Sequence, residues 1–245
     1  MFRCFVIAIF GICFLGFKAS AFTSTNAPST YANINIDGSF TDWSGVPLAY
    51  SMPQVTGARV QFQNLYVAND ANYLYIYFTL YTAANPFTAS QSIFIDTDTN
   101  FNTGNHEHGI GSDLLVQSGN GYQETSGVFN AGAVNGLNYL MASNSLGTSY
   151  ELSISLDATY ASGGAPVFTG NTISLYLESS EGGSVGNEWF PNASGSSEGG
   201  LIYTLGVESV PEPSVAGVSL LCAGCVAVVV IQRRKKFQRF NPKSQ

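Results

Sequence analysis

Residues 72–80 read NYLYIYFTL, and this stretch decides the fold class of the protein. Three tyrosines alternate in it with three other large apolar residues, so an extended chain presents apolar side chains on both of its faces. A strand of this kind is usually central in its sheet and covered on each side. We therefore predict a central β-strand whose tyrosine stripe, Tyr73, Tyr75 and Tyr77, lies beneath another segment. An open aromatic platform is the alternative.

Further strand patterns follow on the C-terminal side of this stretch. They alternate apolar with polar residues or form short apolar runs, and they cover residues 92–95, 113–117, 150–156, 172–178 and 201–205. Segments rich in glycine, asparagine and serine separate them, and neither a helix pattern nor an internal repeat is present. The sequence therefore predicts an all-β domain over residues 22–209, an antiparallel β-sandwich of the jelly-roll or immunoglobulin-like kind.

On the N-terminal side, residues 36–47 read IDGSFTDWSGVP. Later segments complete a series, namely Tyr-Leu-Tyr-Ile after Asp70, Ile95-Asp-Thr-Asp-Thr-Asn with Thr103-Gly104, Ser112-Asp113-Leu-Leu-Val, and Tyr150-Glu-Leu-Ser-Ile-Ser-Leu. In this order the series resembles the family 9 carbohydrate-binding modules and their DOMON-like relatives over residues 34–205. The resemblance implies an antiparallel β-sandwich and at most a hint of sugar binding. In the opening motif we expect structural roles for Asp37, Gly38, Asp42 and Trp43, with Trp43 in the core.

The two ends of the chain predict export. Residues 1–21 combine a positive start at Arg3, an apolar stretch and the small residues Ala19-Ser-Ala21, which together indicate a secretory signal peptide. At the other end, residues 210–214 read VPEPS and form an extended linker, because prolines cannot join a helix or a sheet ladder. Residues 215–231 carry no charge and suit a short transmembrane helix, and the basic tail at 232–245 is expected to stay cytoplasmic.

This C-terminal order resembles the PEP-CTERM sorting signal of Gram-negative bacteria. Its motif is Pro211, Glu212 and Pro213, and its membrane stop is Arg233, Arg234, Lys235 and Lys236. The resemblance implies processing by an exosortase near the Pro-Glu-Pro motif. It also implies transient anchoring in the inner membrane, followed by release to the cell surface or the extracellular matrix. An ordinary single-pass anchor is the alternative.

The exported part is far more acidic than the whole chain. Residues 22–210 hold fifteen acidic residues and a single basic one, Arg59, which gives a formal charge of −14. Nucleic-acid binding is excluded, because it needs lysine and arginine to neutralise phosphates. For Arg59 we expect a pair with a partly buried carboxylate or, alternatively, contact with a ligand. All four cysteines lie outside this part, so it has no disulfide, cysteine metal site or cysteine nucleophile.

One loop has the spacing of a calcium site. Oxygen-bearing residues and a glycine occur at offsets 1, 3, 5, 7, 9 and 12, the pattern of an EF-hand loop; they are Asp96, Asp98, Asn100, Asn102, Gly104 and Glu107. Phe101 replaces the usual glycine and strands flank the loop, so we expect a strand-end calcium loop instead, with Asp113 as a further ligand. The alternative is a polar turn whose side chains bond their own backbone. His106 and His108 form a second, weaker metal candidate.

Carbohydrate binding needs an exposed aromatic ring that stacks on a sugar. Trp189, in the turn-rich segment Asn187-Glu-Trp-Phe-Pro191, is the candidate, with packing under a loop as the alternative. No nucleophile motif or oriented base indicates an enzyme, and no pair of acids is singled out for glycoside hydrolysis. We therefore expect a non-enzymatic surface or matrix protein that contacts extracellular polysaccharide. A calcium-stabilised adhesive module without a sugar ligand is the alternative, and an extracellular hydrolase ranks third.

Overall fold

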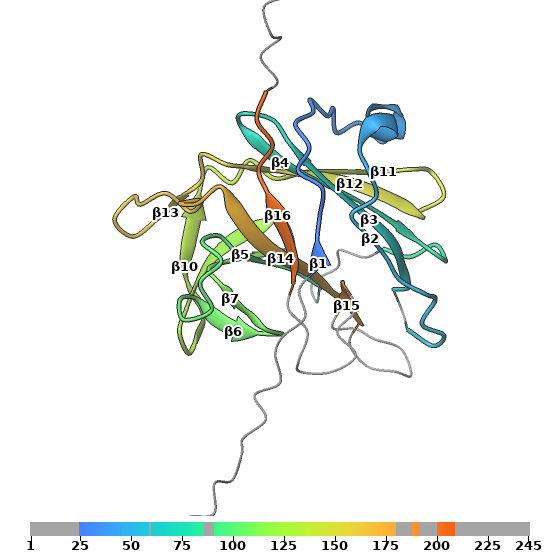
Figure 1. Cartoon of the computed structure of the whole chain (residues 1–245). Helices are drawn as coiled ribbons and strands as arrows, with labels where there is room; N and C mark the ends of the chain where they lie inside the picture. Colours follow the sequence, from blue (N-terminus) through green and yellow to red (C-terminus); the bar gives the residue numbers. More distant parts are fainter. Residues whose placement is uncertain (1–24, 59, 86–90, 180–187, 192–199, 209–245) are drawn as a thin grey trace, which may run out of the picture. The chain divides into compact units, whose positions relative to one another are not determined.

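Two β-sheets face each other in the computed structural model, which describes residues 25–58, 60–85, 91–179, 188–191 and 200–208 (Figure 1). The signal-peptide segment, Arg59, the Pro-Glu-Pro motif, the apolar segment at 215–231 and the basic tail lie outside these residues. Among the described residues, no helix has the length and apolar character needed to cross a membrane.

The larger sheet has nine strands in the order β1-β16-β14-β5-β8-β9-β10-β13, and β15 also pairs with β14. Its strands are β1 (Thr25–Asn26), β5 (Gln91–Asp96), β8 (Leu114–Gln117), β9 (Asn120–Thr125), β10 (Val128–Asn135), β13 (Thr159–Tyr160), β14 (Thr172–Ser179), β15 (Glu188–Phe190) and β16 (Leu201–Thr204). β1 runs parallel to β16, and the other described pairs in this sheet are antiparallel. The predicted antiparallel arrangement therefore holds in this sheet except at the β1–β16 pair.

The smaller sheet has five strands in the order β11-β12-β4-β3-β2. They are β2 (Tyr50–Ser51), β3 (Phe62–Asn69), β4 (Tyr73–Leu80), β11 (Leu140–Ser143) and β12 (Ser149–Ser155). A separate two-stranded hairpin consists of β6 (Asn105–Glu107) and β7 (Ile110–Ser112). β4 lies in the middle of the smaller sheet, between β3 and β12, so the predicted central strand is confirmed.

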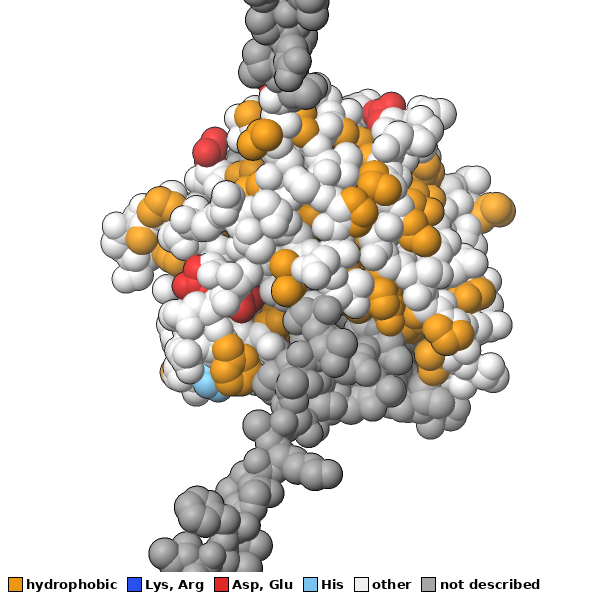
Figure 2. All heavy atoms as spheres, in the orientation of Figure 1, with side chains coloured by type: hydrophobic (Ala, Val, Ile, Leu, Met, Phe, Trp, Pro, Cys, Tyr) orange, Lys and Arg blue, Asp and Glu red, His pale blue; other side chains and the backbone are white. Residues whose placement is uncertain are grey.

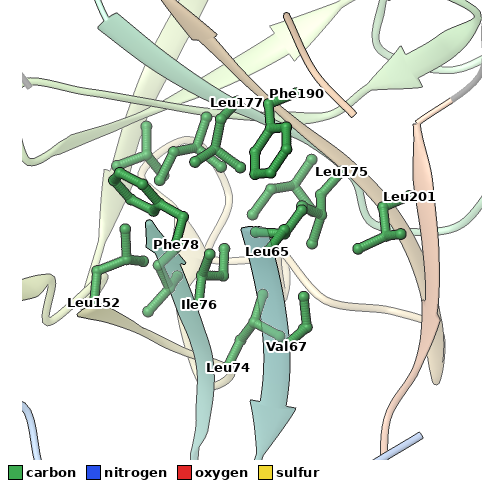
Figure 3. Close-up of a cluster of buried hydrophobic side chains, with 14 of the residues drawn as sticks. Leu65, Val67, Leu74, Ile76, Phe78, Leu152, Leu175, Leu177, Phe190 and Leu201 are labelled. Atoms are coloured by element: carbon green, nitrogen blue, oxygen red, sulfur yellow. The ribbon is translucent and has the colours of Figure 1, made fainter. Parts of the chain in front are cut away.

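The hydrophobic core lies between the two sheets (Figure 3). From the smaller sheet, Ile76, Phe78 and Leu152 point toward Leu175 and Leu177 of the larger one, and all five side chains are buried. Alternation with a period of two sends these residues inward and their sequence neighbours outward. The β-sandwich part of the prediction is confirmed; the finer comparison with jelly-roll and immunoglobulin-like arrangements stays a prediction.

The tyrosine stripe of β4 lies on the other face of the smaller sheet and is covered, as predicted. The N-terminal segment crosses this face and forms a short 3-10 helix, η1 (Phe40–Gly45). Trp43 in this helix is 4% exposed, and its ring centroid lies 5.2 Å from that of Tyr77. Trp43 is therefore a core residue, which agrees with the sequence prediction.

A fully buried carboxylate attaches the opening motif to the smaller sheet. Glu151 of β12 is 0% exposed, and its Oε1 accepts hydrogen bonds from the backbone N–H groups of Asp37, at 3.0 Å, and Gly38, at 2.7 Å. Its Oε2 accepts one from Trp43 Nε1 at 2.9 Å. Gly38 has φ +82°, and a Cβ there would lie 2.8 Å from the carbonyl oxygen of Ser143. Only glycine therefore fits this close approach.

The two aspartates of the motif shape its local turns. The Asp37 carboxylate accepts hydrogen bonds from Ser39 N, at 2.7 Å, and Asn35 Nδ2, at 2.8 Å. Asp42 accepts one from Asn35 N at 3.0 Å. These contacts are local and solvent-exposed, which places both aspartates in structural positions.

Candidate functional site

A row of four side chains crosses the outer face of the larger sheet. In register, Trp189 of β15 lies opposite Glu178 of β14, Glu178 opposite Ser92 of β5, and Ser92 opposite Gln117 of β8. Gln117 Nε2 donates a hydrogen bond to Ser92 Oγ at 3.2 Å. Because adjacent strands lie about 4.8 Å apart, the row places one aromatic ring beside three polar groups at short, regular intervals.

A second row lies next to the first and is apolar. Tyr176 of β14 lies opposite Phe94 of β5, Phe94 opposite Leu115 of β8, and Leu115 opposite Tyr122 of β9. The rings of Phe94 and Tyr176 are stacked, with centroids 4.8 Å apart. This rigid, largely aromatic row therefore lies beside the polar groups.

Two further segments complete a pocket over these rows. Its volume is about 390 Å³, and Glu107 from the β6–β7 hairpin and Phe129 from β10 line it together with the first row and Phe94. β10 shifts register between Val128 and Gly132, and Phe129 lies within this irregular stretch. The volume falls in the range of small-molecule binding sites.

Trp189 is partly buried and lines this pocket. Its ring centroid lies 5.3 Å from that of Tyr176, in an edge-on arrangement, and 3.3 Å from that of His108. Burial lowers the pKa of His108, which favours the neutral imidazole beside the indole. The structure thus combines the two alternatives for Trp189, since one part of the ring packs and another part borders the pocket.

Next to Glu107 lies a buried carboxyl group that the sequence did not single out. Glu124 of β9 is 2% exposed, and its Oε1 accepts a hydrogen bond from Asn130 N at 2.8 Å. Within the described part of the chain, Glu124 Oε2 and the hydroxyl of Tyr176 have no hydrogen-bond partner. Burial, together with the charge of Glu107, raises the pKa of Glu124 to about 7.

The Glu124→Gln variant tests this electrostatic cost. The pKa of Glu124 is about 7 in the folded protein against 4.5 in an unperturbed chain, so its ionisation destabilises the fold progressively as the pH rises above about 4.5. Glutamine mimics the protonated acid. We expect it to raise Tm by about 2–4 °C at pH 7.5, the shift that 1 kcal/mol produces in a domain of this size, and to have little effect at pH 5. Thermal melts at the two pH values measure this, and an equal effect at both would contradict it.

Three carboxylates gather at one end of the larger sheet. Oxygens of Asp96, Asp98 and Asp113 all lie within 4.8 Å of one another. Asp96 ends β5 and Asp113 immediately precedes β8, so the pairing of these two strands brings them together. Burial, together with the charge of Asp113, raises the pKa of Asp96 to about 6, and burial raises the pKa of Asp113 as well.

Backbone and side-chain donors fix the loop that carries these acids. Asp96 Oδ1 accepts hydrogen bonds from Asp98 N, at 3.3 Å, and Asn100 N, at 3.2 Å, while Asp98 Oδ1 accepts one from Asn100 N at 2.9 Å. Asp113 Oδ2 accepts one from Thr97 N at 3.0 Å. Gly104, at φ +66°, closes the loop where a Cβ would lie 2.1 Å from the carbonyl oxygen of Ser112. The loop therefore carries the predicted carboxylates. It is also a polar turn in which these side chains accept hydrogen bonds from the loop's own backbone, which was the alternative.

The predicted ligand set is only partly assembled. Asn102 N donates a hydrogen bond to Asn100 Oδ1 at 3.1 Å, so the Asn100 amide oxygen stabilises the turn. Glu107 lies in the pocket described above and does not belong to the carboxylate cluster. Its position follows from the β6–β7 hairpin, whose two turn residues, His108 and Gly109, have φ +40° and +84°.

The two histidines contact different partners. The ring of His106 stacks on Phe101 with centroids 4.4 Å apart, whereas His108 packs on Trp189. Neither belongs to a cluster of three metal-ligating side chains among the described residues. The arrangement gives no support to the prediction of a shared transition-metal site.

Comparisons with known proteins give a structural likeness. No protein-family model matches the chain, and no curated protein matches it. Among solved structures, the chain is similar to a family 9 carbohydrate-binding module from Caldicellulosiruptor kristjanssonii, determined in complex with cellotriose. The TM-score is 0.44 at 16% sequence identity, over 78% of this chain and 97% of that one.

Several residues of the pocket escaped the sequence analysis. They include Phe94 of the lining, and the buried Glu124 and Tyr176 close to it were missed as well. A strand pattern was visible for 92–95 and 172–178, and its outward positions include Phe94 and Tyr176. No sequence signal marked Glu124, because β9 lies in a stretch rich in glycine and polar residues.

Proposed function

We propose that the protein is a non-enzymatic carbohydrate-binding protein and that its ligand occupies the pocket beside Trp189. The observation that carries the proposal is the row formed by Trp189, Glu178, Ser92 and Gln117. An aromatic ring offers a face for the C–H groups of a sugar, and carboxylate, hydroxyl and amide groups next to it bond the sugar's hydroxyls. The inward neighbours of these residues belong to the rigid core, which pre-organises the row.

A binding screen tests this proposal. The purified full-length chain is applied to an array of oligosaccharides and to gels that contain soluble polysaccharides, and we expect retention by at least one glycan class. Competition by the free oligosaccharide should release the protein. Uniform absence of retention across neutral, amine-bearing and acidic glycans would contradict the proposal.

A second candidate function is calcium binding at the Asp96–Asp98–Asp113 cluster, which stabilises the sheet end as in an adhesive surface module. Three carboxylates within 4.8 Å repel one another, and no lysine or arginine occurs among the described residues to compensate them. A hard divalent cation favours such oxygen ligands. A calcium-stabilised module without a sugar ligand remains the alternative to the first proposal.

Calorimetric titration with calcium tests the second candidate. We expect binding in the roughly 0.1–1 mM range typical of extracellular modules, and we expect Asp98→Asn to weaken it by about tenfold, because affinity follows the number of ligand charges. Asp98 is exposed, so the substitution leaves the core unchanged. The exposed Asp157 serves as the matched control, and Asp157→Asn should bind like the wild type. No heat at millimolar calcium would end this candidate.

We also propose that the protein is exported and sorted by an exosortase to the cell surface or the extracellular matrix. The support is sequence alone: the Pro211-Glu-Pro213 motif, the uncharged segment at 215–231 and the basic cluster that follows it. Mass spectrometry of both termini of the mature protein in a host with this sorting system provides the test. An intact basic tail on the surface-located protein would contradict the proposal.

A further inference from the structure

A bulge in β10 brings a pocket residue to a place that a regular strand would not reach. In register, the row that contains Phe94 of β5 crosses β8 and β9 and ends at Ala133 of β10, about 14 Å away. Phe129 precedes Ala133 by four residues, which adds about 13 Å along a regular strand. The ring centroid of Phe129 nevertheless lies 6.3 Å from that of Phe94, and both rings line the pocket. The chain at Phe129 therefore lies over the outer face of the larger sheet.

Two extra residues in β10 form this bulge. On either side of it the register is set by two pairs, Val128–Thr125 and Gly132–Gln123. Between the pairs, three residues of β10 face the single residue Glu124 of β9. Asn130, the middle one of the three, has φ +56°, a left-handed conformation that asparagine adopts more readily than most residues. Because bulges bend a strand and redirect its side chains, this bulge accounts for the position of Phe129.

The side chain of Glu124 holds the middle of the bulge. Its Oε1 accepts a hydrogen bond from the backbone N–H of Asn130 at 2.8 Å, and its own backbone N–H donates one to the carbonyl oxygen of Asp113 at 2.8 Å. Glu124 is 2% exposed, so its bond to the bulge is largely shielded from water. The described residues contain no lysine or arginine, and Figure 2 shows red but no blue side chains on the face that it displays. Among these residues, a backbone N–H and not a basic side chain therefore binds this carboxylate.

Burial alone does little to hold the bulge in place. Phe129 is 49% exposed and Val128, the residue before it, is 50% exposed. A stretch with so little buried apolar surface opens easily unless a specific contact holds it. The hydrogen bond from Asn130 to Glu124 is such a contact, and it lies one residue away from the ring that lines the pocket.

We propose that Glu124 is a positioning residue of the carbohydrate pocket, which holds Phe129 in the pocket lining through the backbone N–H of Asn130. The inference rests on the carbohydrate-binding function proposed above and adds a residue that acts on the ligand through another one. Glu124 is not part of the pocket lining, so its effect on binding passes through the bulge. A side chain that is fixed before the ligand arrives costs less conformational entropy on binding.

The first test needs no ligand. Glu124→Met keeps the length of the buried side chain and removes the acceptor oxygens, whereas Glu124→Gln keeps one acceptor. By NMR, hydrogen exchange of the Asn130 amide should accelerate at least about tenfold in the methionine variant and much less in the glutamine variant. The nuclear Overhauser effect between the rings of Phe129 and Phe94 should disappear together with this protection. An unchanged exchange rate and a preserved ring contact in Glu124→Met would overturn the positioning role.

The second test measures the affinity of the purified full-length chain for the oligosaccharide that the glycan array retains most strongly. Glu124→Met and Phe129→Ala should each weaken binding by about five- to tenfold. The double variant should lose no more than either single one, because both changes remove the same ring from the pocket. Glu124→Gln should recover most of the affinity. Val128→Ala, which shortens an exposed side chain outside the pocket lining, should bind like the wild type.

The outcomes separate this inference from the proposed function. Full affinity in a folded Glu124→Met protein, or losses that add in the double variant, would overturn the positioning role and leave carbohydrate binding intact. Absence of glycan binding by the wild type would overturn the proposed function, while amide exchange and the ring contact still decide whether Glu124 holds Phe129. Circular dichroism verifies folding, and Glu124→Leu, which also lacks the acceptor, serves as the second variant.

Discussion

Replacing Trp189 with alanine is expected to weaken carbohydrate binding by about 30- to 150-fold, which corresponds to about 2–3 kcal/mol. The indole ring is the aromatic end of the row across β15, β14, β5 and β8, and it borders the pocket next to Glu178. Alanine removes the stacking face and leaves the polar groups without a platform that fixes the sugar. Titration of the variant with the best ligand from the glycan screen measures the loss.

The conservative Trp189→Phe variant provides the control for this experiment. Phenylalanine keeps an aromatic face on the same strand, so most of the affinity should return, whereas a purely structural role would show as a parallel loss of Tm. The melting temperatures of both variants are therefore measured beside their affinities. Unchanged binding by a folded Trp189→Ala protein would place the ligand elsewhere and remove the pocket from consideration.

Glu151→Ala is expected to destabilise the protein by at least about 3 kcal/mol, and thus to lower Tm by roughly 6–12 °C. The fully buried carboxylate accepts hydrogen bonds from Asp37 N, Gly38 N and Trp43 Nε1. Truncation leaves these three donors unsatisfied, and each costs about 1–3 kcal/mol. It also releases the N-terminal segment that covers the tyrosine stripe of β4.

Glu151→Gln separates hydrogen bonding from packing. The amide keeps one acceptor oxygen and the shape of the side chain, so we expect a loss between those of the wild type and the alanine variant. Chemical denaturation of all three proteins gives the free energies of unfolding. If Glu151→Ala lost less than about 1 kcal/mol, the typical net value of a single hydrogen bond, the anchoring role would be disproved.

The sequence predicted the sandwich because its central strands alternate clearly. The patterns at 72–80, 150–156 and 172–178 correspond to β4, β12 and β14. β10 could not be recognised, since most of its residues are exposed and it contains glycine and asparagine instead of an apolar alternation. Strand signals of this kind report burial, and a strand that is mostly exposed gives none.

The candidate site was predictable only in its parts. Trp189 and the Asp96–Asp98–Asp113 group were singled out from local sequence, yet the row that gives Trp189 its polar neighbours depends on the register of four strands far apart in the chain. Pairing register cannot be read from any one segment. Glu107 was assigned to calcium from its offset, and the tight β6–β7 hairpin turned it toward the pocket.

The position of β16 has a mechanical consequence. This last described strand lies inside the larger sheet, with β1 on one side and β14 on the other, and the chain leaves it toward Glu208. Tension on that end would act along the strand and shear two ladders of hydrogen bonds at once, whereas an edge strand would peel away one bond at a time. β14 also carries Glu178 of the pocket, so a pull between a bound ligand and the C-terminal end would be transmitted within a single sheet.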